Sequence, residues 1–152
     1  MSAFRKIVLP FLFLLSSGVA LAADGLIMVK SNHSVAATAD RLEAALSKNG
    51  MTIMNRIDHA AGAESVNMEL RPTELVIFGN PKVGTPLMQC SQTVAVDLPQ
   101  KALIWEDENG QVWLGYNDPQ YLKIRHAIEG CDPVLAKVGA ALKNFARAAT
   151  AD

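Results

Sequence analysis

A predicted β-hairpin over residues 101–117 constrains the fold of this chain more than any other feature of its sequence. Two apolar runs, at residues 102–106 and 112–116, flank a segment that contains Asn109-Gly110. Asn-Gly favours a two-residue turn, because both central residues of such a turn adopt positive φ. The chain is therefore expected to contain at least one antiparallel pair of strands.

Centring the turn on Asn109-Gly110 pairs Trp105 with Leu114 on one face of the hairpin. The other face is then expected to carry Ile104, Trp113 and Gly115. A tryptophan beside an aliphatic residue marks either an interface or an apolar ligand site when exposed. Burial under a neighbouring loop is the equal alternative for Ile104 and Trp113.

The rest of the sequence alternates predicted strands and helices. Short apolar runs predict strands at residues 25–30, 51–58 and 74–78, with Ile53 and Ile57 on one side of the second. Helical spacing and capping residues predict helices that start after Ser34, Asp118 and Asp132. This order predicts an α+β fold, a two-layer sandwich with a mixed or antiparallel sheet of about five strands and helices packed on one face.

Several predicted strands are apolar on both faces. In residues 74–78, Leu75 and Ile77 alternate with Val76 and Phe78, so this strand is expected to be central and covered on both sides. Three helices can cover one face of the sheet. The other face then requires the segment 81–98, a second subunit or a ligand, and a homodimer is an ordinary solution.

The N-terminus has the pattern of a cleavable signal peptide. Arg5 and Lys6 precede an apolar run that is interrupted by Pro10, and a small-residue cleavage site ends near Ala22. The apolar run is shorter than the roughly 20 residues of a membrane span. We expect residues 1–22 to be removed and residues 23–152 to form a single periplasmic or secreted domain without stable membrane insertion.

The charge of the mature chain argues against a nucleic-acid partner. Loss of Arg5 and Lys6 leaves 12 of the 14 basic side chains against 15 acidic ones, a net charge near −3. Affinity for phosphate backbones comes from clustered positive charge, which this sequence lacks.

Cys90 and Cys131 are the only cysteines, and both belong to the mature part. In an oxidising compartment they form a natural disulfide pair, and closing a loop of this length stabilises the fold by about 3–4 kcal/mol. Two free buried thiols or a metal-binding pair are the alternatives. The sequence contains no Cys-x-x-Cys motif of the kind used in redox catalysis or zinc sites.

Several blocks carry a family resemblance. The segment 71–88, RPTELVIFGNPKVGTPLM, closely resembles the signature of the domain of unknown function 302 family, as do residues 57–61, 97–103 and 116–119. The resemblance spans residues 24–145 and implies a small α+β fold. It implies no established activity, cofactor or catalytic residue.

The segment 79–86, in which Asn80, Lys82, Gly84 and Thr85 are the candidate ligand residues, follows a predicted strand and precedes a predicted helix that has Pro86 in its first turn. A helix N-terminus can bind an anion, and Lys82 would add charge. The segment lacks the phosphate-binding Gly-x-x-x-x-Gly-Lys pattern, and a rigid strand-to-helix turn explains its prolines and glycines equally.

His33, His59 and His126 are candidate metal ligands, together with the methionines. No two of these histidines lie within one helical turn, and each has a structural alternative at a helix or strand end. A hydrolase would need a nucleophile and a base, for which Ser65, Ser91, His59 and Asp58 are present without a nucleophile-elbow motif.

The sequence thus favours a non-enzymatic periplasmic binding or accessory protein whose partner is an unknown small ligand, a periplasmic protein or a second copy of the chain. Two alternatives stay open. One is a metal- or cofactor-binding protein in periplasmic redox processes, and the other is an enzyme that uses the segment 80–86. No specific cofactor is indicated.

Overall fold

The structure, a computed structural model, describes residues 25–152, so the expected signal peptide lies outside the described residues. The elements are β1 (Leu26–Lys30), α1 (Val35–Lys48), β2 (Thr52–Asp58), α2 (His59–Glu64), β3 (Thr73–Gly79), α3 (Pro81–Cys90), the 3-10 helix η1 (Gln92–Val96), β4 (Gln100–Glu106), β5 (Val112–Asn117), α4 (Pro119–Arg125) and α5 (Asp132–Thr150). No described helix is long and apolar enough to cross a membrane.

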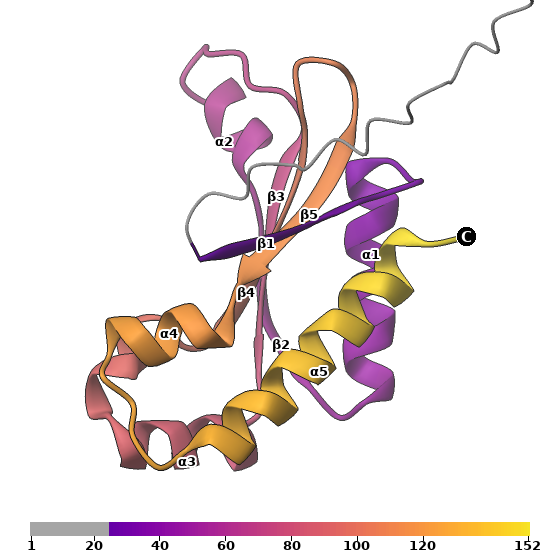
Figure 1. The fold of residues 1–152 in the computed structure, drawn as a ribbon. Coiled ribbons are helices and arrows are strands. Elements are labelled where there is room, and N and C mark those ends of the chain that lie inside the picture. Colours follow the sequence, from indigo (N-terminus) through magenta and orange to yellow (C-terminus); the bar gives the residue numbers. More distant parts are fainter. Residues whose placement is uncertain (1–24) are drawn as a thin grey trace, which may run out of the picture.

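The five strands form one antiparallel sheet in the order β1-β5-β4-β3-β2. Helices α1 and α5 pack side by side and cover one face of this sheet. Figure 1 shows α2 and α3 at opposite ends of the strands, where β2 and β3 end. The predicted α+β class with helices on one face is confirmed.

Two helix starts follow the capping residues of the sequence, whereas α5 begins at Asp132 itself and has no side-chain cap. Ser34 is the N-cap of α1, and its Oγ accepts a hydrogen bond from the N–H of Ala37 at 3.3 Å. Asp118 caps α4 in the same way, with Pro119 in the first turn. These side chains satisfy backbone donors that a helix cannot satisfy itself.

The predicted register of the β4–β5 hairpin is wrong by one residue. Trp105 lies opposite Trp113 rather than Leu114. The turn is longer than two residues because the Asp107 carboxylate accepts the N–H groups of Asn109 and Gln111, at 2.9 and 3.0 Å. Only glycine in this turn has positive φ, so the two-residue Asn-Gly turn does not form.

The shifted register separates the two residues that were expected to share a face. Ile104 is fully buried under the helices, whereas Trp113 lies on the opposite face and is half-buried. Because side chains alternate along a strand, a shift of one residue exchanges the two faces.

Strand β2 contains a β-bulge between Ile53 and Asn55, which the sequence did not predict. The extra residue places Ile53 beside Phe78 on the helix-covered face and Ile57 beside Leu75 on the other face. The expectation that Ile53 and Ile57 share one side is therefore wrong.

The bulge also directs Arg56 toward the helix layer. Its Nε donates a hydrogen bond to the largely buried Glu74 at 2.5 Å, and its Nη1 pairs with Asp40 of α1. The hydrogen bond to Glu74 is the main reason why the pKa of Arg56 is raised above its ordinary range. Arg56 thus links β2, β3 and α1.

The two faces of the sheet differ in how they are covered. Val76, Ile104 and Leu114 are fully buried against α1 and α5, with at most 1% of their surface exposed. We call the other side the open face. It carries the half-buried side chains Leu26, Met28, Ile57, Leu75, Ile77, Leu103, Trp105 and Trp113.

No described helix packs across the open face, and the second subunit or ligand that the sequence offered as a cover stays a prediction. Strand β3 is not covered on both sides by described elements, because only α2 contacts it from outside the α1 layer, and α2 lies at the end of the sheet. The segment 81–98 does not cover the open face either. It forms α3 and η1, which contact each other, and α3 packs against α5.

Candidate functional site

Most of the candidate ligand segment 79–86 is helical rather than a loop. The sequence placed Pro86 in the first turn of a helix, but α3 begins five residues earlier at Pro81, with Asn80 as its N-cap. The Asn80 Oδ1 accepts the N–H of Lys82 at 2.9 Å. Asn-Pro is the stronger helix start, because Asn80 supplies a capping oxygen and Pro81 has no backbone N–H that would need an acceptor. Inside the helix, Pro86 then costs one backbone hydrogen bond.

A cavity of about 640 Å³ lies between α3 and α5. All eight residues from 81 to 88 line one wall. The opposite wall is formed by one stripe of α5, consisting of Val134, Lys137, Val138, Ala141, Leu142 and Phe145. The volume falls within the range of about 300–1,000 Å³ that is typical of small-molecule sites.

The remaining sides of the cavity come from the end of the sheet and from the segment after α3. Its floor contains Phe78, Gly79 and Gln100 together with Met51 and Met54. Ala95, Leu98 and Pro99 close the side next to η1. Most of these side chains are apolar, so the cavity offers burial rather than a polar reaction centre.

The structure places all four candidate ligand residues, Asn80, Lys82, Gly84 and Thr85, in the lining of this cavity. Their role in binding stays a prediction. The sequence did not reveal the α5 wall, because its apolar positions are equally explained as ordinary core positions of a helix.

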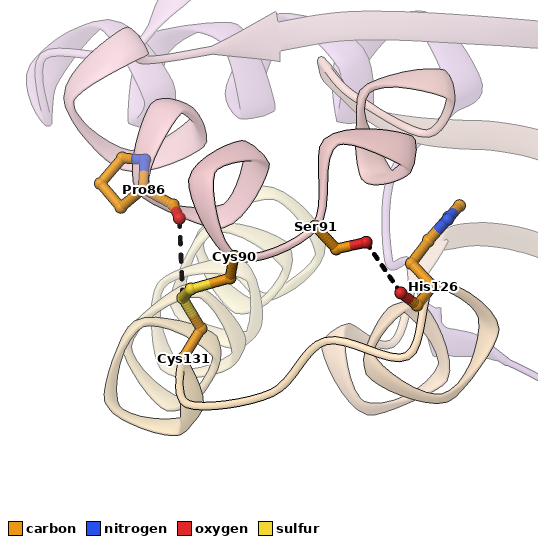
Figure 2. Close-up of a disulfide and its surroundings, with 5 residues drawn as sticks. All are labelled: Pro86, Cys90, Ser91, His126 and Cys131. Atoms are coloured by element: carbon orange, nitrogen blue, oxygen red, sulfur yellow. Dashed lines mark hydrogen bonds between the residues drawn. A yellow bond between two sulfur atoms is a disulfide. The ribbon is translucent and has the colours of Figure 1, made fainter.

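A disulfide joins the two helices that form the cavity walls. Cys90 is the last residue of α3, and Cys131 immediately precedes α5; their Sγ atoms are bonded, and their Cα atoms are 6.4 Å apart. Figure 2 shows the Cys131 Sγ beside the carbonyl oxygen of Pro86, at 3.6 Å. The predicted cysteine pairing is confirmed, and it tethers α3 to α5 at one end of the cavity.

Next to the disulfide, His126 joins α4 to the segment after α3. The Ser91 hydroxyl donates to the His126 carbonyl at 2.8 Å (Figure 2). The ring nitrogens of His126 lie 3.1 Å from Thr93 Oγ1 and 2.5 Å from Asp97 Oδ2. Sequence reasoning missed this cluster, since His126 is about 30 residues away from Thr93 and Asp97 along the chain.

A hydroxyl, an imidazole and a carboxylate in series resemble a hydrolytic relay. None of the three residues lines the cavity, however. Asp97 also pairs with Arg125 at 3.3 Å, at the end of α4. The geometry is that of a polar link that fixes η1 against α4.

The structure does not bring the three histidines together as a metal site. His33 Nε2 lies 3.0 Å from the carbonyl oxygen of Ala151, and His126 contacts η1. His59 is the first residue of α2 and is exposed. Within residues 25–152, no group of three or more His, Cys, Asp or Glu residues is placed to hold a metal ion.

The other residues considered for hydrolysis support helix ends. Asp58 is the N-cap of α2 and accepts the N–H of Ala61 at 2.9 Å. Ser65 follows α2 and donates its hydroxyl to the carbonyl of Gly62 at 2.7 Å. Neither residue lines the cavity between α3 and α5.

The open face has its own local packing. A Cβ at Gly115 would meet Trp105 at 3.1 Å and Leu26 at 3.3 Å, so the missing side chain lets these two residues close over β5. Trp113 donates its indole N–H to Asp107 Oδ2 at 2.8 Å, and Lys30 lies 5.3 Å from the centre of its ring. The hydrogen bond from Trp113 is the main reason why the pKa of Asp107 is lowered. The homodimer expected from the apolar open face stays a prediction.

Comparison with known proteins finds fluoride-specific ion channels that are similar in sequence and a solved structure that is similar in fold. The fluoride-specific ion channel FluC 1 of Brucella suis is 51% identical over 105 residues, which are 69% of this chain and 41% of that protein. A second such channel, FluC 2 of Brucella melitensis, is 51% identical over 105 residues, 69% of this chain and 39% of that protein. The chain therefore spans about two fifths of the length of these relatives.

A solved structure shares the fold. The crystal structure of an uncharacterized conserved protein DUF302 from Bacillus stearothermophilus superposes with a TM-score of 0.75 at 17% identity, over 84% of this chain and 99% of that one. The family model for the domain of unknown function DUF302 matches residues 27–148. The cavity, the disulfide and strands β2–β5 all lie within this range, and the chain belongs to the DUF302 family.

Proposed function

We propose that this chain is a binding domain that holds a small, largely apolar molecule in the cavity between α3 and α5. The observation that carries the proposal is the cavity itself, about 640 Å³ in volume and lined mainly by apolar side chains from two helices and the end of the sheet. Burying an apolar ligand there removes both ligand and wall surface from water, which provides the driving force for binding.

The arrangement favours binding over catalysis. The lining contains neither histidine nor cysteine nor any acidic residue, and its one hydroxyl side chain, Thr85, is exposed. An activated hydroxyl nucleophile requires a base within hydrogen-bond reach, and the lining holds no carboxylate or imidazole that could act as one.

We further propose that the domain acts in the periplasm or outside the cell. The N-terminal sequence has the pattern of a signal peptide, and a disulfide persists in such oxidising compartments. Fluoride transport is the activity named for the Brucella relatives, of whose length this chain spans about two fifths.

Binding of a neutral apolar dye, such as N-phenyl-1-naphthylamine, tests the proposed function. The mature protein is expected to increase the dye's fluorescence in a saturable way, with about one site per chain. Ala141 lines the cavity, whereas its neighbour Ala140 is exposed and lies outside the lining. Ala141→Phe is therefore expected to abolish binding, and Ala140→Phe is the matched control that keeps it.

Circular dichroism of both variants shows whether they fold. If Ala141→Phe does not fold, Thr85→Phe introduces the same bulk from the exposed rim of α3. Dye binding that is equal in the wild type and in a folded cavity-filling variant would refute the proposed site.

A further inference from the structure

Every ionisable side chain that lines the cavity is basic. Lys82 comes from α3 and Lys137 from α5, so the two opposite walls each contribute one ammonium group. The lining includes no aspartate, glutamate or histidine. The mature chain is acidic overall, so an exclusively basic lining does not simply follow from its composition.

Neither lysine forms an ion pair with another residue of the described range. The cationic members of the observed pairs are Arg56, Lys123, Arg125 and His126. Local sequence explains this, because positions three and four residues away on a helix are those that supply ion-pair partners. For Lys137 these positions are Pro133, Val134, Ala140 and Ala141, and none is acidic.

The positive charge comes from the lysines rather than from free backbone donors at the start of α3. The N–H of Lys82 is taken by the Asn80 side chain, and the N–H groups of Val83 and Gly84 bond to the Asn80 carbonyl, at 2.9 and 3.0 Å. Both lysine side chains are exposed at the rim, where long aliphatic stems can lie along apolar surface while the ammonium groups stay in water.

We propose that the ligand is an anionic amphiphile, whose apolar body fills the cavity and whose acidic head group lies at the rim beside Lys82 and Lys137. This inference rests on the proposed function and adds the chemical class of the ligand. A long-chain carboxylate is the simplest member of the class. A single-chain phosphate presents the same chemistry, an anion at one end of an alkyl chain, and would use the same two ammonium groups.

Ligands with the same alkyl chain and different head groups test this class. Dodecanoate, dodecyl phosphate, dodecanol and dodecylamine are used to displace the neutral dye from the mature protein, below the concentrations at which they form micelles. We expect both anions to bind about tenfold more tightly than dodecanol, and dodecylamine to bind most weakly. The preference for anions over dodecanol is expected to fall as salt is added, because these lysines are solvent-exposed.

Removing the charges of Lys82 and Lys137 tests whether these two side chains cause the preference for anionic ligands. The double variant Lys82→Gln/Lys137→Gln is expected to lose most of the tenfold preference for dodecanoate while its affinity for dodecanol stays unchanged. Lys143→Gln, on the same helix but outside the lining, is the matched control and is expected to keep the preference.

The outcomes separate this inference from the proposed function. Equal affinity of the wild type for dodecanoate and dodecanol would overturn the anionic class and leave apolar binding intact. Failure of every ligand and of the dye to bind would overturn the proposed function itself. Dodecanoate binding without dodecyl phosphate binding would narrow the class to carboxylates, and the reverse result would narrow it to phosphates.

Discussion

The two faces of the sheet are built from the same strands and are both apolar, yet the helices of residues 25–152 close only one of them. On the covered face, Ile104 has none of its surface exposed. Its neighbour Leu103 points to the open face and is half-buried. Apolar residues on both faces of a strand therefore indicate that both faces avoid water, but they do not specify what covers each face.

The cavity belongs to the covered side and lies where that covering is incomplete. α5 contributes to both the cavity and the core. Its side chains Val138, Leu142 and Phe145 line the cavity and are also part of the hydrophobic core. The tightly packed part of this layer stabilises the fold, and its gap beside α3 is the proposed binding site. The open-face side chains, by contrast, line neither this cavity nor the hollow beside α2 and residues 67–71.

Shortening a side chain of the covered face is expected to destabilise the protein more than any other change considered for the two faces. Ile104→Ala is expected to lower the free energy of unfolding by about 4 kcal/mol, because truncation of a fully buried aliphatic residue leaves a cavity. Leu103→Ala is the matched variant on the open face and is expected to cost about 1 kcal/mol. Urea unfolding at low protein concentration measures both, and equal losses would show that the open face is covered in solution.

Removal of the disulfide is expected to have a slightly smaller effect. The double variant Cys90→Ser/Cys131→Ser loses a link across 41 residues, which corresponds to about 3–4 kcal/mol of unfolding free energy. Chemical reduction of the wild type should give the same midpoint in urea. Because the disulfide tethers only the covered layer, the loss should be the same in the Leu103→Ala background. A non-additive result would link the disulfide to the open face.

The smallest expected effect is the pH dependence contributed by Asp107 on the open-face side. The pKa of its carboxyl group is lowered mainly by the hydrogen bond from Trp113, so the folded state favours the ionised form. The resulting stability is present above the unfolded pKa of about 3.9 and is lost as the pH falls through the folded value.

Asp107→Asn removes this titration. The stability difference between wild type and variant is expected to be constant between about pH 5 and 7 and to shrink below about pH 4. Urea unfolding at several pH values, followed by tryptophan fluorescence, measures this difference. A difference that grows on acidification would contradict the assigned hydrogen bond.

Sequence reasoning succeeded where local chemistry determines structure. Ser34 and Asp118 start helices because their side-chain oxygens satisfy backbone donors, and that function depends on only a few neighbouring residues. The pairing of Cys90 with Cys131 was also predictable, since they are the only cysteines of the chain.

The predicted strand faces were wrong where the backbone departed from a regular hairpin or strand. Asp107 lengthened the hairpin turn through its carboxylate, and an extra residue in β2 separated Ile53 from Ile57. Each change shifts a strand by one residue, which moves side chains to the opposite face. A prediction of faces therefore needs the turn and bulge geometry, which hydrophobic alternation does not encode.

The candidate site was predictable only in part. Asn80 and Lys82 stood out because of the unusual segment around them, and both line the cavity. The α5 wall did not stand out, because Val138 and Ala141 are typical of any core-facing helical stripe. Cavities form between segments that are distant in sequence, so pairing α3 with α5 required the tertiary structure.

The methionine methyl groups report most directly on whether the cavity is the binding site. Met51, Met54 and Met88 line it, Met28 lies on the open face, and Met68 lies beyond α2. NMR spectra of methyl-labelled mature protein, titrated with dodecanoate, are predicted to show shifts of the first three signals, with Met28 and Met68 unchanged. A shift of Met28 with the three cavity methyls unmoved would place the ligand on the open face and contradict the account.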